Sequence, residues 1–219
     1  TEQFQFHNTV VALGKFDGMH KGHQLIFDEL IQYKQLGYQA AVFSFDRPPL
    51  NMLKHKHMRV IYTTNEKIKL LARRGIDIYI EHPFTDEFSH LSPEDFVIKV
   101  LLEKTGMKVL VVGDDCGFGY KRQGNVELLE RMSKEYDFKL IVIPKLELEG
   151  EIVSSTRIRH LLSEGKVEEA NRLMEDPFMI CGSVVHGNHM GAEVLQMPTA
   201  NQIPLEDKLL PPNGVYVSR

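Results

Sequence analysis

The sequence contains little cysteine, no long hydrophobic run and no excess of positive charge. Its only two cysteines, Cys116 and Cys181, cannot form a disulfide framework, so we expect a reducing, cytoplasmic location. No apolar run reaches the roughly 18 residues that a membrane-spanning helix needs, which excludes a membrane protein of that kind. The chain holds 26 Lys and Arg residues against 30 Asp and Glu residues, so binding to the phosphates of a nucleic acid is disfavoured.

The first residues show neither a secretory signal nor an initiator methionine, and the last residues have a strand-like pattern. The opening residues, TEQFQFHNTV, have neither a charged start nor an apolar segment, and therefore indicate no secretory signal. The chain has no initiator methionine and ends in GVYVSR, a strand-like pattern. We therefore expect it to be part of a longer protein, and the sequence specifies no oligomeric state.

Short β-branched, apolar runs alternate with amphipathic segments through the first 165 residues. The runs are continuously apolar, which is typical of strands buried on both faces of a sheet. We expect strands at 9–14, 38–45, 76–82, 108–115 and 138–144. We expect helices at 22–36, 64–74, 93–104, 125–136, 155–163 and 166–173. This alternation predicts an α/β fold with a Rossmann-like parallel sheet.

The pattern changes after Pro177. Residues 178–187 and 214–219 predict two strands, with a turn-rich stretch between them and no helix pattern. We therefore expect a first domain over residues 1–177 and a partial small β domain over residues 178–219. Apolar residues such as Phe178, Ile180 and Val184 are expected to pack this second part against the first.

The segment GKFDGMHKGH, residues 14–23, joins the first expected strand to the first expected helix. It is neither the GxGxxG nor the GxxxxGK[ST] phosphate-binding motif. Its glycines allow a ligand to approach the backbone, and the helix that begins there attracts phosphate. His20 and His23 lie three residues apart at the helix start, so both can donate to a phosphoryl oxygen from the same side. The pattern therefore favours phosphoryl transfer.

Two further segments add candidate phosphate and ligand contacts. Ser154, Ser155 and Thr156 stand at the start of an expected helix, where hydroxyls and free amides can hold phosphate, and two arginines that can add charged contacts, Arg157 and Arg159, follow. Gly113, Asp114 and Asp115 end the fourth expected strand, and residues 117–119 then form a loop that can approach a flat ligand.

These segments resemble three motifs of the HxGH nucleotidyltransferase superfamily, in the form carried by bacterial FAD synthetases. GKFDGMHKGH resembles the GxFDGxHxGH signature, VSSTRIR (153–159) resembles ISSTxIR, and VVGDDCGFGYKRQGN (111–125) resembles a stretch with a GxDFxFG core. The resemblance covers about residues 8–175 and implies transfer of AMP from ATP to FMN, with Mg²⁺ as cofactor. It implies catalytic roles for His20, His23 and Arg159.

The resemblance also implies the binding residues. Nucleotide-binding residues would be Gly14, Phe16, Asp17, Gly18, His20, His23, Gly113, Asp115, Ser154, Ser155, Thr156 and Arg159. Flavin-binding residues would be Phe45, Pro49, Asp114, Asp115 and Phe118.

The chain departs from the family pattern near the expected flavin pocket. Cys116 replaces the first Phe of the GxDFxFG core, while Arg47 and Pro48 replace the first Pro and the His of an FxPHP segment. These changes bear on flavin affinity. We expect Cys116 to be structural rather than reactive.

The C-terminal segment resembles the start of a riboflavin kinase domain. Residues 198–201, PTAN, match a motif whose Thr and Asn serve metal and ATP phosphates, so Thr199 and Asn201 are possible metal contacts. The rest of that domain is expected to be missing or reduced, so this chain is not expected to phosphorylate riboflavin.

The sequence therefore predicts an FMN adenylyltransferase that binds small molecules, with no nucleic-acid or membrane partner. Three alternatives remain open. The first is a related HxGH enzyme with another phosphorylated acceptor, such as phosphopantetheine or nicotinamide mononucleotide. The second is a flavin-binding protein without turnover. The third is a bifunctional riboflavin kinase and FAD synthetase, if the full-length chain completes the second domain.

Overall fold

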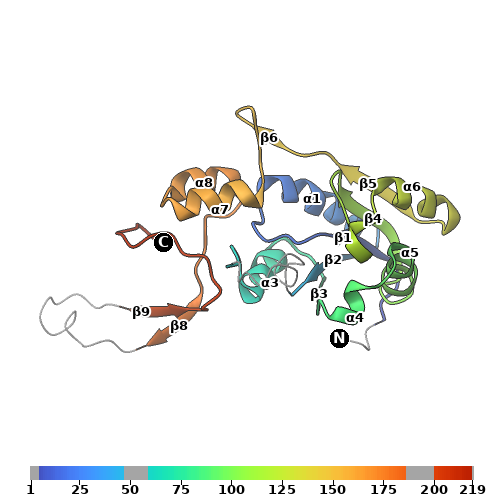
Figure 1. Cartoon of the computed structure of the whole chain (residues 1–219), viewed down its shortest axis with the longest axis horizontal. Helices are drawn as coiled ribbons and strands as arrows, with labels where there is room; N and C mark the ends of the chain where they lie inside the picture. Colours follow the sequence, from blue (N-terminus) through green and yellow to red (C-terminus); the bar gives the residue numbers. More distant parts are fainter. Residues whose placement is uncertain (1–4, 47–58, 186–199, 219) are drawn as a thin grey trace, which may run out of the picture.

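The computed structural model describes residues 5–46, 59–185 and 200–218, and its centre is a five-stranded parallel sheet. The strands lie in the order β3-β2-β1-β4-β5, so β1 is central (Figure 1). From β1 the chain first adds β2 and β3 on one side of the sheet and then β4 and β5 on the other. The strands are β1 (Thr9–Leu13), β2 (Gln39–Phe45), β3 (Ile78–His82), β4 (Met107–Gly113) and β5 (Lys139–Ile143). Strand order reverses between β1 and β4, which is where ligands bind in open α/β sheets.

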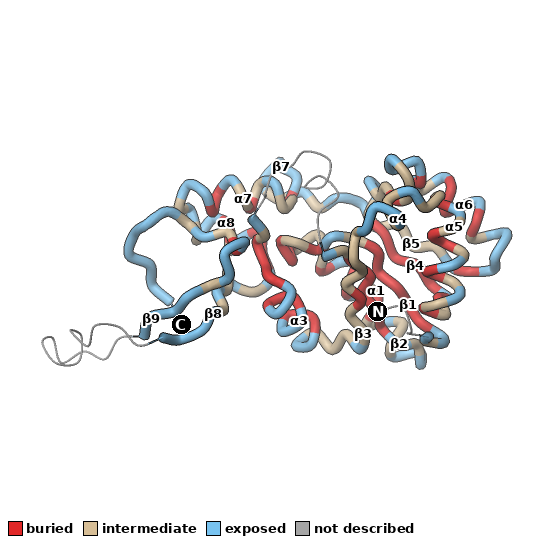
Figure 2. Tube along the Cα trace, turned by 60° about the horizontal axis from the view of Figure 1, so that its bottom comes forward, coloured by how far each residue is buried: buried red, intermediate tan, exposed pale blue. Residues whose placement is uncertain are grey.

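Helices cover both faces of this sheet, as the continuously apolar strands require. The longer helices are α1 (Lys21–Gln35), α3 (Thr64–Arg73), α6 (Val126–Glu135), α7 (Ser155–Ser163) and α8 (Val167–Leu173). Alternate β1 residues face opposite sides: Val10 and Ala12 pack with α1, α3, α7 and α8, whereas Val11 and Leu13 pack towards α6. Figure 2 shows the central strands buried between partly exposed helices. The expected α/β fold is therefore confirmed.

The segment expected to form one helix at 93–104 is divided instead. It begins as α5 (Pro93–Asp95), where the Ser92 side chain caps the first turn, and continues as the π-helix η1 (Phe96–Leu102). The wider winding still buries Phe96, Val97 and Leu101 against the sheet.

Four short elements were not expected from the sequence. They are α4 (Asp86–Ser89), the 3₁₀ turn η2 (Tyr120–Arg122) and the antiparallel pair β6 (Glu147–Leu148) and β7 (Glu151–Ile152). Each has only two to four residues, too few to produce a hydrophobic period.

The C-terminal part differs from its prediction. Only Gly182–Val185 of the segment 178–187 is described as a strand, β8, and it pairs with β9 (Asn201–Pro204) in the stretch expected to be turns. The described part of GVYVSR is not a strand, and Val215 and Val217 are fully exposed. Phe178 packs against the core cluster as expected, but Ile180 and Val184 are exposed, so their predicted burial is wrong.

Candidate active site

The turn between β1 and α1 is held in an unusual backbone conformation. Phe16 and Met19 have positive φ angles of 47° and 43°, a backbone conformation that residues other than glycine adopt rarely. Both side chains are buried in the core, and the Phe16 ring contacts the rings of His23 and Phe27. Such strain persists only where packing fixes it, and it is common at functional sites.

His20 and His23 form a stacked pair at the start of α1. Their ring centroids are 3.6 Å apart. His20 caps the helix, because its Nδ1 accepts a hydrogen bond of 3.3 Å from the backbone N–H of His23. A neutral imidazole that accepts at Nδ1 carries its proton on Nε2. The cap therefore leaves the Nε2–H of His20 available as a donor.

Both histidines are held in the neutral form. Burial lowers the pKa of His20 to about 4, although the carboxylate of Asp115 opposes this change. The pKa of His23 is lowered well below its usual value, mainly by burial and to a smaller extent by the neighbouring His20. Near neutral pH the pair therefore presents uncharged N–H groups. The buried Nδ1 of His23 has no hydrogen-bond partner among the described residues.

Asp17 joins this turn to helix α7. One carboxylate oxygen of Asp17 accepts from the N–H of Ile61 at 3.0 Å, and the other forms an ion pair with Arg159. Arg159 also donates to the backbone carbonyl of Arg59. Asp17 and Arg159, predicted from separate motifs, are therefore in direct contact.

The first turn of α7 lies against the glycine-rich turn. A Cβ at Gly18 would come within 3.0 Å of the Ser155 hydroxyl, so the close approach depends on glycine. Ser154 caps α7 by accepting from the N–H of Arg157, whereas Thr156 is exposed. Gly14 serves packing, because a Cβ there would lie 2.7 Å from the Phe16 ring.

The residues at the end of β4 lie near the histidine pair, next to the β1–α1 turn. Gly113 ends the strand, and Asp114 and Asp115 follow with exposed side chains. Asp114 accepts from the N–H of Lys145 at 3.2 Å, and Asp115 forms an ion pair of 3.2 Å with the Lys145 side chain. Asp115 is near enough to influence the pKa of His20.

The structure places the two described aromatic residues of the predicted flavin set, Phe45 and Phe118, away from the histidine pair, whereas Asp115 of that set lies near His20. Phe118 is 5% exposed and packs against Phe96 on the α6 face of the sheet, where Phe45 contacts Phe84 and Phe88. The flavin roles of Phe118 and Phe45 stay predictions. Pro49, Arg47 and Pro48 lie outside the described residues, as does Thr199.

The remaining candidates are placed as follows. Burial raises the pKa of the Cys116 thiol to about 12, which agrees with its expected structural role. Asn201 is an exposed residue at the start of β9. No cluster of three or more His, Cys, Asp or Glu side chains that could hold a metal occurs in the described part of the chain.

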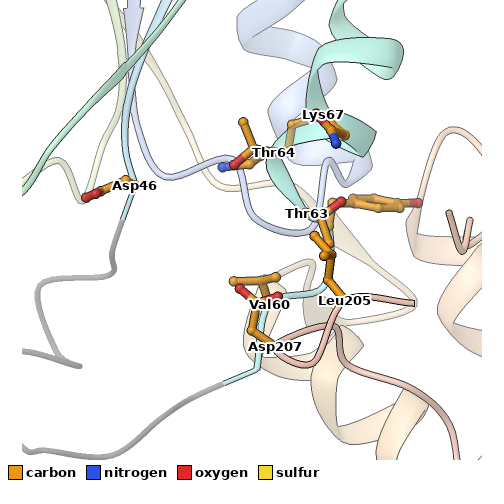
Figure 3. Close-up of a pocket in the computed structure, with 9 residues that line it drawn as sticks. Asp46, Val60, Thr63, Thr64, Lys67, Leu205 and Asp207 are labelled. Carbon is orange, nitrogen blue, oxygen red and sulfur yellow. The ribbon is translucent and has the colours of Figure 1, made fainter. Parts of the chain in front are cut away.

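A small pocket of about 120 Å³ lies beside α3 rather than at the histidine pair. Asp46, Val60, Thr63, Lys67 and Asp207 are among the residues that line it (Figure 3). Residues 59–61 belong to none of the motifs that predict the site, although they contact both Asp17 and Arg159. Their contribution comes from backbone atoms, which residue types do not reveal.

None of the described helices has the length and hydropathy that a membrane crossing requires. Two family models match the chain. The model described as FAD synthetase matches residues 2–157, and the model described as riboflavin kinase matches residues 174–219.

Several curated relatives are named bifunctional riboflavin kinase/FMN adenylyltransferase. The protein of Buchnera aphidicola subsp. Schizaphis graminum is 39% identical over 95% of this chain and 67% of its own length. That of Listeria monocytogenes is 36% identical over 99% and 69%, and that of Escherichia coli K12 is 32% identical over 94% and 66%. The chain thus spans about two thirds of the length of these relatives.

A solved structure from Streptococcus pneumoniae is similar over most of the chain. It has a TM-score of 0.82 and 32% identity, and the match covers 96% of this chain and 68% of that one. It is described as a macrolide-efflux protein, which differs from the names of the sequence relatives. The similarity shows that the two chains share a fold.

Proposed function

The chain belongs to the FAD synthetase family and is a nucleotidyltransferase of the FMN adenylyltransferase type, and from this premise we propose how its residues act. A phosphate oxygen of FMN attacks the α-phosphorus of ATP, and the bond between that phosphorus and the bridging oxygen of pyrophosphate breaks. FAD and pyrophosphate result. The observation that carries this mechanism is the neutral His20–His23 pair beside the Asp17–Arg159 ion pair.

The histidines would stabilise the charge that develops on the transferred group. The Nε2–H of His20 is free to donate, and the helix cap fixes the orientation of its ring. Preorganised donors of this kind strengthen their bonds as negative charge develops in the transition state. The FMN phosphate is already ionised near neutral pH, because the second pKa of a phosphate monoester is roughly 6, so no strong general base is required.

Arg159 would bind the triphosphate. A guanidinium has five N–H donors, and the bonds to Asp17 and Arg59 use two of its nitrogens while fixing its plane. Ser155 and the amides at the start of α7 lie on the same side as Gly18 and would bind the phosphates that follow.

We propose that Mg²⁺ arrives as part of the ATP substrate. Magnesium commonly binds one or two carboxylates together with substrate phosphates. Asp17 is largely buried and engaged by Ile61 and Arg159. Asp115 is exposed and lies near His20, so it is the carboxylate that would contact Mg²⁺, in exchange for its surface ion pair with Lys145. Bound Mg²⁺ would reduce the negative charge of the triphosphate.

Product analysis tests the acceptor. The protein is incubated with ATP, Mg²⁺ and either FMN, phosphopantetheine or nicotinamide mononucleotide, and the products are separated by chromatography. We expect FAD from FMN and no adenylylation of the other two. Adenylylation of either alternative would indicate a related HxGH enzyme. Tight FMN binding without FAD formation would indicate a flavin-binding protein.

We propose further that the whole protein is bifunctional and also phosphorylates riboflavin. The riboflavin kinase match over residues 174–219 and the names of the relatives support this second activity. Adenylyl transfer alone is therefore too narrow a description. We place the domain boundary near residue 177, and the cytoplasmic location remains a prediction. FMN formation from riboflavin and ATP, measured on the full-length protein, tests the kinase activity.

A further inference from the structure

Lys208, in the segment that matches riboflavin kinase, is buried against the first domain. It is 1% exposed. Its ammonium donates to the carbonyl of Ile61 at 2.6 Å, to the carboxylate of Glu66 at 2.7 Å and to the carbonyl of Met179 at 2.7 Å. An ammonium has three donors, so all of them are used. Long, flexible lysine side chains are rarely buried this completely.

The groups around Lys208 stabilise its positive charge. Its nitrogen lies 4.8 Å from the centroid of the Tyr62 ring and 4.5 Å from that of Phe178. Glu66 is fully buried, and it also accepts from the N–H groups of Thr63 and Cys181. Burial lowers the pKa of Lys208, and its bond to Glu66 opposes this change. The ion pair is therefore fully hydrogen-bonded, which is the condition under which a buried pair is tolerated.

The backbone around Lys208 forms a β-bridge with the first domain. Val60 donates to the carbonyl of Asp207 and accepts from the N–H of Leu209, both at 2.7 Å. Figure 3 shows Val60 and Asp207 side by side. Lys208 and this bridge together fix residues 59–61 through both backbone and side-chain bonds.

The other contacts of residues 59–61 lead to the proposed active site. The N–H of Ile61 donates to Asp17, and the carbonyl of Arg59 accepts from Arg159. Ile61 is therefore bonded on one side to Lys208 and on the other to the carboxylate that pairs with Arg159.

We propose that Lys208 is a positioning residue for adenylyl transfer, because it holds segment 59–61 and thereby orients the Asp17–Arg159 pair for ATP. The C-terminal segment would then set the geometry of a site whose reacting groups all belong to the first domain. This inference rests on the function proposed above.

The test compares variants by stability and by kinetics. Lys208→Met removes the ammonium and keeps most of the apolar side chain, and Glu66→Gln/Lys208→Met removes the whole ion pair without leaving an unpaired buried charge. Lys69→Met is the matched control, because Lys69 is an exposed lysine of α3 that contacts Cys181 in the C-terminal segment but not residues 59–61. Tm and the kcat and KM for ATP are measured for each variant, at a temperature well below its Tm.

We expect kcat/KM for ATP to fall roughly tenfold or more in Lys208→Met and in the double variant, since small displacements of positioning groups have effects of this size. Lys69→Met should match the unsubstituted protein. In Asp17→Asn, adding Lys208→Met should cause little further loss, because both changes act on the same contact.

Variants that lose Tm but keep kcat/KM, or that add independently to Asp17→Asn, would overturn the proposal. Failure of both the single and the double variant to fold would also overturn it, since that outcome assigns Lys208 a structural role. If the unsubstituted protein makes no FAD in the same assay, the proposed function fails instead.

Discussion

His23 lies at the centre of the proposed site, half-buried between the rings of His20 and Phe16. Its neutral state follows from burial and from the adjacent His20, so we propose that it acts as a hydrogen-bond donor rather than as a cation. A donor of this kind contributes mainly where negative charge develops during the reaction.

We predict that His23→Ala lowers kcat by roughly a hundredfold, the usual cost of removing one preorganised donor to an oxyanion. The Kd for ATP should change much less, because the bond strengthens mainly in the transition state. Steady-state kinetics and calorimetric ATP binding measure the two effects. His160→Ala, at an exposed position of α7, is the control, and a kcat near that of the unsubstituted protein in His23→Ala would remove His23 from the mechanism.

At the scale of elements, His20 couples helix α1 to pH. The folded pKa of His20 is about 4, below the value near 6.5 that it takes in an unfolded chain. Between these values the unfolded state binds more protons, so the free energy of unfolding falls as the pH decreases from about 6.5 to about 4.

We predict that His20→Asn reduces this dependence, while His23, whose pKa is also lowered by burial, retains its own part of it. Asparagine keeps a side-chain acceptor at the helix cap but does not titrate. The difference between the two proteins should amount to at most about 3 kcal/mol across this pH window. Urea unfolding at several pH values measures it, with His160→Asn as the control. Parallel curves for the unsubstituted protein and His20→Asn would show that His20 is not held neutral.

The core elements could be predicted because the hydrophobic pattern of each one indicates which of its residues are buried. Each strand of the sheet is a continuous apolar run, and the bounds found for β1 and α7 differ by at most one residue from those expected. The chain order of strands and helices also places His20 and Ser155 at the same edge. The site residues could therefore be collected from three separate motifs.

The elements that were missed depend on contacts rather than on pattern. Residues 214–219 alternate like a strand, but Val215 and Val217 are fully exposed because no neighbouring strand pairs with them in the described structure. Residues 201–204 look like turns, but they pair with β8. Lysine is usually a surface residue, so the sequence predicts an exposed Lys208. Its burial is explained only by its bonds to Glu66 and Ile61 in the folded chain.

At the scale of the whole molecule, the C-terminal segment is attached through a few buried groups. The β8–β9 pair lies far from β5 and α6 in Figure 1, and its outward residues Val184 and Ile203 are exposed. Phe178 contacts the ring of Tyr62, and Lys208 lies over both rings. These contacts, together with the β-bridge at Val60 and the bond from Cys181 to Glu66, join the two parts.

We predict that deleting residues 178–219 destabilises the first domain. The deletion exposes Tyr62 and removes the partner of Glu66. Loss of one buried aromatic contact alone costs on the order of 2 kcal/mol, so Tm should fall measurably and FAD synthesis should weaken. Thermal unfolding and FAD assays of the truncated and complete chains test this. Unchanged stability and activity would show that the segment does not support the first domain.

The central claim is that the chain transfers the adenylyl group of ATP to the phosphate of FMN. The most direct test uses ATP carrying a radioactive α-phosphate, incubated with Mg²⁺, FMN and the protein, with the products separated by chromatography. We predict that the label appears in FAD and that an equal amount of unlabelled pyrophosphate is released. Label that remains in ATP, or that appears in AMP without FAD, would contradict the account.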